Sequence, residues 1–178
     1  MGKIGIFFGT DTGRTRRIAK LIAQKLGEAA TDPLNINRAS VDDLLAHKAL
    51  ILGTPTLGDG ELPGLDSGAQ TESWLEFLPK LAGHDFSGHV IALFGLGDQD
   101  KYPDEFVDAI ALLHDAFSTQ GARLIGEWPT EGYKFNASQA NVGGQFIGLA
   151  LDQINQPALT ETRLDAWLAS IKPALLAA

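Results

Sequence analysis

Residues 3–26 read KIGIFFGTDTGRTRRIAKLIAQKL, and this stretch combines an apolar strand, a tight loop and a helix. The apolar run at 3–8 is typical of a strand that is buried in a parallel sheet. After the loop, apolar residues recur at helical spacing: Ile18, Leu21, Ile22 and Leu26. Because a strand followed directly by a helix is the repeating unit of α/β proteins, the stretch predicts that class of fold.

The same strand-and-helix unit recurs along the chain. Further apolar runs are PLNINR at 33–38, KALILGTP at 48–55, HVIALFGLGD at 89–98, ARLIGEW at 122–128 and QFIGLALD at 145–152. Several such units in succession predict a doubly wound α/β fold with a parallel sheet, in which residues 1–178 form a single domain. The segment 129–144, rich in Gly, Asn and Ser, separates the last two runs and is interpreted as an insertion.

Two helices have clear end signals. The helix after the fourth strand is expected to begin at Pro103, which suits a first helical position, and to stop at Gly121. Asp104 and Glu105 would then lie at its positive end. The last helix is expected to begin at Thr160.

Composition excludes several kinds of chemistry. The chain holds 14 Lys and Arg against 22 Asp and Glu, a net charge of −8, so its own field repels nucleic acid and anionic membranes. There is no cysteine, which removes disulfides, thiolate catalysis and iron–sulfur ligation. The four histidines are scattered, and we assign them no metal site. With no apolar leader and no stretch near the ~20 residues of a membrane span, a cytoplasmic protein is expected.

The loop GTDTGRT at 9–15 has the features of a phosphate site. Thr10, Thr12 and Thr15 supply hydroxyls, Gly13 lets the backbone curl, and the start of the following helix offers free N–H groups. A γ-phosphate with magnesium would need the ending GK[ST], and a dinucleotide would need GxGxxG; the loop has neither pattern. The loop therefore predicts a monophosphate ester that is held mainly by neutral donors.

Two further loops are expected at the same edge, because all strands of a parallel sheet end on one side. The loop TPTLGDGELPG at 54–64 carries Leu57 at a glycine-flanked tip, where it can cover one face of a planar ring. The loop FGLGDQDKYPDEF at 94–106 supplies Tyr102 for the other face and Asp98 at the strand end. A phosphate loop beside two such covers predicts a site for flavin mononucleotide (FMN).

Taken together, these motifs resemble those of a flavodoxin, specifically a long-chain flavodoxin of the type associated with nitrogen fixation. The resemblance covers essentially the whole chain and rests on GTDTGRT, ILGTPTLGDGELPG, ALFGLGDQDKYPDEF, GEWPTEGYKF and FIGLALDQINQ. Flavodoxin is itself a type example of the strand order 2-1-3-4-5, so the resemblance, and not the sequence pattern, implies a five-stranded parallel sheet in this order. It also implies that an insertion splits the fifth strand.

The resemblance further implies which residues hold FMN. Those at the phosphate are Thr10, Asp11, Thr12, Gly13, Arg14 and Thr15. Those at the isoalloxazine ring are Pro55, Thr56, Leu57, Gly58, Asp59 and Gly60 on one side, and Leu96, Gly97, Asp98 and Tyr102 on the other. Glu105 and Asp152 are implied as neighbours. Two positions depart from the family, since Trp is frequent where Leu57 stands and Asn where Glu105 stands, and both departures affect the tuning of the redox potential.

The expected activity is electron transfer, with FMN supplying the electron chemistry and the protein setting its energies. The Gly58–Asp59 carbonyl can accept the N5–H of a neutral semiquinone, since glycine changes its dihedrals at low cost. Acids such as Asp59, Glu61, Asp98 and Asp100 disfavour an anionic hydroquinone. A cost of about 3 kcal/mol lowers the second couple by roughly 130 mV. We therefore expect a low-potential one-electron carrier on the semiquinone/hydroquinone couple, and not an enzyme.

The acidic surface suits basic redox partners. By resemblance, the donor is a flavoprotein or ferredoxin-type reductase, the acceptor is the nitrogenase iron protein, and the carrier is a monomer. An FMN-dependent NAD(P)H or quinone reductase is the alternative, although it needs substrate space over the ring, where Leu57 and Tyr102 stand. A response-regulator receiver needs a phosphoacceptor Asp after the third strand, where this chain reads GTP. A module that binds no cofactor is the other alternative.

Overall fold

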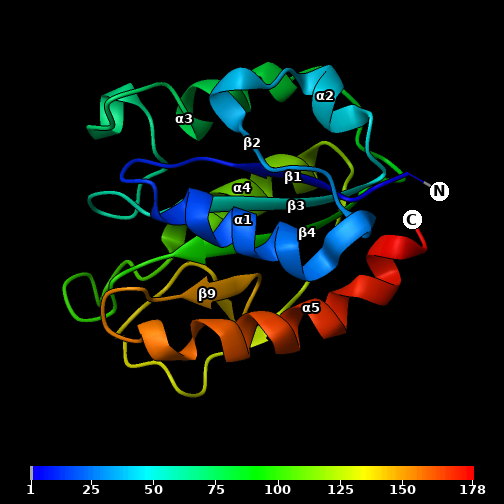
Figure 1. The fold of residues 1–178 in the computed structure, drawn as a ribbon. Coiled ribbons are helices and arrows are strands. Elements are labelled where there is room, and N and C mark those ends of the chain that lie inside the picture. Colours follow the sequence, from blue (N-terminus) through cyan, green and yellow to red (C-terminus); the bar gives the residue numbers. More distant parts are fainter. Residues whose placement is uncertain (1) are drawn as a thin grey trace.

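The computed structural model describes residues 2–178. Its central sheet consists of the strands β1 (Gly5–Phe8), β2 (Leu34–Asn35), β3 (Ala49–Pro55), β4 (Val90–Leu96), β5 (Arg123–Ile125) and β9 (Leu149–Leu151). The order is β2-β1-β3-β4-β5, with β9 also paired to β4, and every pair is parallel. The predicted α/β fold and its strand order are thus confirmed (Figure 1).

The fifth strand is split, as the resemblance implies. β5 pairs with Val90–Ala92 and β9 pairs with Phe94–Leu96, so the two short strands follow one another along the same side of β4. The chain between them forms a small antiparallel sheet of order β6-β8-β7. Its strands are β6 (Trp128–Pro129), β7 (Asn141–Val142) and β8 (Gln145–Phe146).

Helices cover both faces of the central sheet, and each face has its own apolar core. On one face, α1 (Arg14–Leu26) and α5 (Thr160–Leu176) pack with residues such as Ile22 and Trp167 against Ile51. On the other face lie α2 (Val41–Leu45), α3 (Trp74–Phe77) and α4 (Asp108–Thr119), whose core includes Leu50 and Leu52. Because consecutive strand residues point to opposite faces, a continuous apolar strand such as β3 supplies both cores.

The helix after β4 begins later than the sequence predicts. α4 starts at Asp108, and not at Pro103, because Val107 has a left-handed backbone with φ 50° that interrupts the helix. The insertion occupies the backbone groups that precede it: the carbonyl of Pro103 accepts N–H bonds from Asn136 and Ala137, at 2.7 and 2.9 Å. A tertiary contact therefore replaces the first helical turn. The last helix does begin at Thr160, as predicted.

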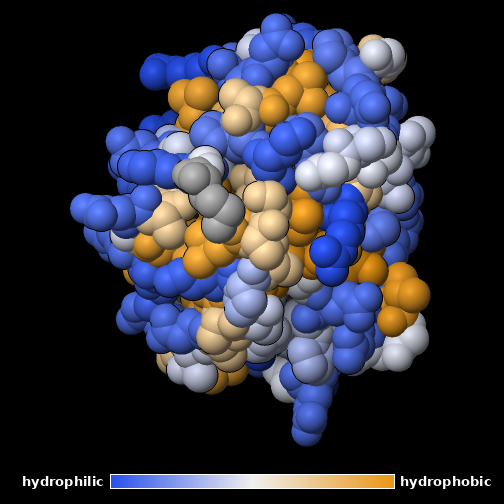
Figure 2. Space-filling view, turned by 90° about the vertical axis from the view of Figure 1, so that its right-hand side faces the viewer, coloured by the Kyte–Doolittle hydropathy of each residue, from blue (hydrophilic) through white to orange (hydrophobic). Residues whose placement is uncertain are grey.

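The two ends of the sheet differ in character. The carboxyl ends of β1, β3 and β4 lie together at the left in Figure 1, and both termini lie toward the opposite side. Figure 2 shows that opposite side, where hydrophilic residues cover most of the surface and hydrophobic ones appear between them in small groups. The loops with candidate site residues all belong to the first end.

Candidate functional site

A pocket of about 480 Å³ lies at the carboxyl end of the sheet. This volume falls within the range of small-molecule and cofactor sites, about 300–1,000 Å³. Four segments, which follow β1, β3, β4 and β9, contribute its walls. The lining residues are Thr10, Asp11, Thr12, Arg14, Thr15, Pro55, Thr56, Leu57, Gly58, Leu96, Gly97, Asp98, Lys101, Tyr102, Gln153 and Ile154.

The loop after β1 forms a seat for an anion at the start of α1. Thr10 Oγ1 accepts a hydrogen bond from Gly13 N at 3.0 Å, which curls the loop, and Gly13 has φ 92°. The first N–H groups of a helix have no partner within the helix, and the positive end of the helix dipole lies there. No acidic residue stands in the first turn of α1. The loop can therefore bind a phosphate group through N–H groups and threonine hydroxyls.

A buried contact fixes the beginning of this loop. The carbonyl of Gly53 in β3 accepts from Gly9 N and from the indole Nε1 of Trp74, both at 2.9 Å. Trp74 is fully buried, and a Cβ at Gly9 would lie 2.5 Å from its ring. Only glycine fits at position 9, so the anion seat is placed by a fitted backbone contact between β1, β3 and α3.

The loop after β3 is a tight turn. Leu57 N donates to Glu61 O at 2.8 Å and Glu61 N donates to Leu57 O at 2.7 Å. Gly58 and Gly60 have φ 48° and 94°, conformations that glycine adopts without steric cost. The turn thus presents Leu57 and Gly58 to the pocket on a short, closed loop.

The buried carboxylate of Asp108 lies behind this turn. A Cβ at Gly60 would lie 2.8 Å from Asp108 Oδ2, and Asp108 Oδ1 accepts a hydrogen bond from Gln139 N at 2.7 Å. Burial raises the pKa of Asp108, although the bond from Gln139 acts in the opposite direction. Desolvation likewise raises the pKa of Glu105, and the negative charge of Asp59 acts in the same direction. Negative charge is therefore already disfavoured around this turn.

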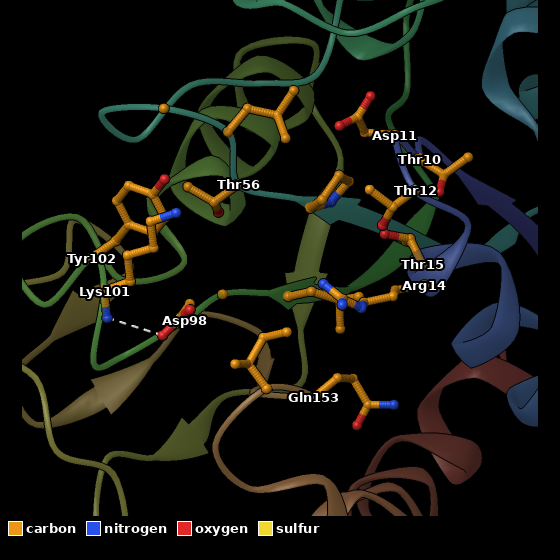
Figure 3. Close-up of a pocket in the computed structure, with 16 residues that line it drawn as sticks. Thr10, Asp11, Thr12, Arg14, Thr15, Thr56, Asp98, Lys101, Tyr102 and Gln153 are labelled. Atoms are coloured by element: carbon orange, nitrogen blue, oxygen red, sulfur yellow. Dashed lines mark hydrogen bonds between the residues drawn. The ribbon is translucent and has the colours of Figure 1, made fainter.

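The loop after β4 wraps around the side chain of Asp98. Asp98 Oδ1 accepts from Lys101 N at 2.9 Å and from Asn155 Nδ2 at 2.8 Å, and Tyr102 N donates to Asp98 O at 2.9 Å. Figure 3 shows Tyr102 and Lys101 on the side of the pocket opposite to Asp11, Thr12 and Thr15. The pocket therefore has a phosphate-type end and an end that carries an aromatic side chain.

A fourth segment, after β9, completes the pocket. Gln153 and Ile154 line it, and the side chain of Gln153 is hydrogen-bonded to the hydroxyl of Thr160 at the start of α5. Sequence reasoning missed Gln153, Ile154 and Lys101. The first two follow an apolar run, and all parallel strands end at the same edge, so the signal that identified the other three loops was present here as well.

Most residues predicted to hold FMN come together around the pocket, and five lie outside its lining. Asp59 is exposed on the turn, and Glu105 lies outside the pocket in the segment before α4. Asp152 is fully buried beneath the loops and does not face the pocket. The other two are Gly13 and Gly60. For these five, as for the residues that line the pocket, direct binding of FMN stays a prediction.

Within residues 2–178, no helix is both long and apolar enough to cross a membrane.

Comparison with known proteins gives one consistent result. The Flavodoxin family model matches residues 6–167. A flavodoxin of Klebsiella pneumoniae is 56% identical over 99% of this chain and 100% of its own, and one of Synechocystis sp. is 44% identical over 98% and 99%. The crystal structure of Fusobacterium nucleatum flavodoxin bound to flavin mononucleotide is similar with a TM-score of 0.87, at 34% identity, and covers 98% of this chain and 99% of that one. The chain belongs to the flavodoxin family, the FMN-dependent electron-transfer proteins whose partners are other redox proteins.

Proposed function

We propose that the chain is a low-potential one-electron carrier that binds FMN in the pocket described above. The observation that carries this proposal is the chemical difference between the two ends of the pocket. The anion seat at the start of α1 lies on one side and Tyr102 on the opposite side, and Leu57 lines the pocket from the turn after β3. A phosphate ester with a flat apolar ring matches both ends, whereas an inorganic anion or a nonpolar ligand matches only one.

The donor set suits FMN residue by residue. Thr10, Thr12 and Thr15 would hold the phosphate together with the N–H groups of α1, and Arg14 would add one positive charge. Leu57 and Tyr102 would cover the ring and keep water from it. When bound, FMN supplies the electron chemistry, and these residues bind and orient it.

Two features of the chain would set the potential. The 57–61 turn holds Gly58 at φ 48°, where a peptide can reorient cheaply and offer its carbonyl to a protonated ring nitrogen. Asp59, Asp98 and Asp108 surround the turn and the pocket with negative charge and would disfavour a second added electron. The first electron would thus be accepted readily, and the second only at low potential.

A stepwise reductive titration tests this proposal. A yellow protein that turns blue at half reduction, and bleaches only at much lower potential, is the expected result. Direct passage to the two-electron reduced form without blue colour would contradict it. Oxidation of NADPH by the purified protein alone would favour an FMN-dependent NAD(P)H or quinone reductase instead.

For the partners, we propose that a flavoprotein or ferredoxin-type reductase is the donor and the nitrogenase iron protein the acceptor. The net charge of −8 and the acids near the pocket would complement a basic docking face on the donor and on the acceptor. The rate of electron transfer to the iron protein, measured from low to high salt, is expected to fall steeply as salt rises. A rate that is independent of salt, or no transfer at all, would contradict the assignment.

We also propose that the carrier is monomeric and works in the cytoplasm. Sedimentation of the FMN-loaded protein over a hundredfold range of concentration is expected to give one species of about 19 kDa. A concentration-dependent larger species would contradict the monomer.

A further inference from the structure

A buried hydrogen-bond node lies beneath two of the four pocket loops. Its centre is Gln99, which is 3% exposed, and the carboxylate of Asp152, which is 0% exposed. Asp152 Oδ2 accepts from the backbone N of Gln99 at 3.0 Å and from its side-chain Nε2 at 2.8 Å. The same carboxylate accepts from Ile154 N and from Asn155 N, at 3.0 and 2.9 Å. The loop after β4 and the loop after β9 are thereby tied to a single side chain.

Gln99 also reaches a third segment. Its Oε1 accepts a hydrogen bond from the backbone N of Lys134, which belongs to the insertion, at 2.6 Å. The N–H of Lys134 can only donate and the carboxylate of Asp152 can only accept, so the orientation of the Gln99 amide is fixed by its partners. A glutamine can satisfy both groups at once, because its side chain carries a donor and an acceptor.

The insertion is itself firmly held at this point. Tyr133 Oη donates to Ala150 O at 2.6 Å and accepts from Trp128 Nε1 at 2.9 Å. The guanidinium of the buried Arg163 lies 3.9 Å from the centre of the Tyr133 ring. Burial raises the pKa of Tyr133 to about 12, so the hydroxyl stays protonated and keeps both bonds. Lys134 follows directly in the chain and is thus a fixed donor.

We propose that Gln99 is a positioning residue that transmits the placement of the insertion to the two pocket loops that carry Asp98, Tyr102 and Gln153. The insertion then serves the cofactor site, although none of its residues lines the pocket. This inference rests on the proposed binding of FMN in the pocket. The anion seat at Thr10–Thr15 lies on another loop, and within residues 2–178 no hydrogen bond joins it to Gln99 or Asp152. The node should therefore act mainly on the ring end of the site.

The energetics support this role. Replacing Gln99 by an apolar residue removes the acceptor of the Lys134 N–H and one of the two bonds that Gln99 donates to the Asp152 carboxylate. Losing a hydrogen bond to a charged group is costly, and a donor left without an acceptor adds to that cost. The structure can relieve it by moving the loops until water replaces the lost partners. Such movement displaces Tyr102 from its place beside the ring and Gln153 from the pocket wall.

The experiment compares two pairs of variants of the full chain. Gln99→Leu removes the side-chain hydrogen bonds of Gln99 to Asp152 and Lys134. Its control is Gln145→Leu, since Gln145 is exposed in β8, directly after the insertion. Lys134→Pro removes the N–H that the insertion donates and leaves the Gln99 side chain in place, although proline also fixes φ of residue 134. Its control is Glu131→Pro, because Glu131 occupies the second position of a turn closed by Tyr133 N and Thr130 O, with Gly132 at φ 93°, where proline is well tolerated.

Dissociation constants are measured for FMN, for riboflavin and for inorganic phosphate. We expect Gln99→Leu and Lys134→Pro to weaken FMN and riboflavin binding at least tenfold relative to their controls, while inorganic phosphate binds within twofold of the unmodified protein. A flavin affinity within twofold of the control, or an equal loss of phosphate affinity, would overturn the inference. If the unmodified protein binds no FMN, the proposed function fails instead, and the two failures are distinct.

Discussion

The contact between Asp108 and the 57–61 turn can be tested by adding a single methyl group. In Gly60→Ala the new Cβ would lie 2.8 Å from Asp108 Oδ2, closer than such atoms normally approach. Gly68→Ala is a matched control. Gly68 has φ 93°, against 94° for Gly60, and an added Cβ there meets nothing within 4 Å. The two substitutions therefore share their backbone strain and differ only in the clash.

The expected difference follows from the contacts. A left-handed conformation costs an alanine about 1–2 kcal/mol, and this term is common to both variants. At Gly60 the carboxylate of Asp108 must also turn away and lose its 2.7 Å bond from Gln139 N. A hydrogen bond to a charged group contributes about 1.5–3 kcal/mol. We thus expect Gly60→Ala to be less stable than Gly68→Ala by about 2 kcal/mol, or roughly 4–8 °C in Tm for a chain of this length.

Urea unfolding of the FMN-free variants measures this difference. In an Asp108→Ala background the 2.8 Å contact with Oδ2 is gone and only the 3.1 Å contact with the Cβ of residue 108 remains. The difference between the two glycine substitutions should therefore shrink to within about 0.5 kcal/mol. Equal costs of Gly60→Ala and Gly68→Ala in the unmodified protein would refute the reasoning. A difference that persists in the Asp108→Ala background would assign it to some other contact of the turn.

Three further outcomes are expected. Tyr133→Phe removes the acceptor of the half-buried Trp128 indole N–H and the donor to the carbonyl of buried Ala150, and should lower the free energy of unfolding by about 1–3 kcal/mol in urea; an unchanged midpoint would contradict this. Burial by itself raises the pKa of Asp152, but hydrogen bonds led by that from Gln99 outweigh it and hold the pKa below its ordinary value. The resulting stabilisation is complete above the unfolded-state pKa of about 3.9 and is lost as pH falls through the folded-state pKa, so Asp152→Asn should flatten the fall in stability below about pH 4. A series of urea titrations from neutral to acid pH checks this, and parallel curves for the variant and the unmodified protein would count against it. Leu57→Trp should tighten FMN binding roughly 2- to 12-fold, since an aromatic stack adds about 0.5–1.5 kcal/mol; quenching of flavin fluorescence measures it, and weaker binding would show that Leu57 does not cover the ring.

The sequence predicts the architecture well because the two central strands are long apolar runs. β3 and β4 are buried on both faces, and such runs stand out against any neighbouring segment. The start of α4 is different. Pro103, Asp104 and Glu105 form a good helix start by local rules, yet the insertion takes the Pro103 carbonyl and Val107 breaks the helix. Local preference was overridden by a partner more than thirty residues away in the chain.

The site residues likewise divide into those with a local sequence signal and those whose role depends on tertiary contacts. Thr10, Leu57 and Tyr102 lie on loops with clear local signals, and all three line the pocket. The need for glycine at Gly9 could not be predicted from the sequence, because it comes from the ring of Trp74, which leaves no room for a Cβ there. The roles of Gln99 and Lys134 could not be predicted, because a side chain that bridges three segments has no pattern in any one of them.

The two buried carboxylates beneath the site indicate which loop can move. Asp152 accepts five hydrogen bonds, from N–H groups of Gln99, Ile154 and Asn155, and its pKa is lowered despite burial. Among the described residues, the side-chain carboxylate of Asp108 accepts a hydrogen bond from Gln139 N alone, and burial raises the pKa of this carboxylate. The loops on Asp152 are therefore held by several charge-assisted bonds, which are stronger than bonds between neutral groups. The 57–61 turn instead rests on Asp108 through packing, with Gly58 and Gly60 free to change their dihedrals. We therefore expect the 57–61 turn, and not the wall held by Asp152, to be the part of the site that adjusts as the charge in the pocket changes.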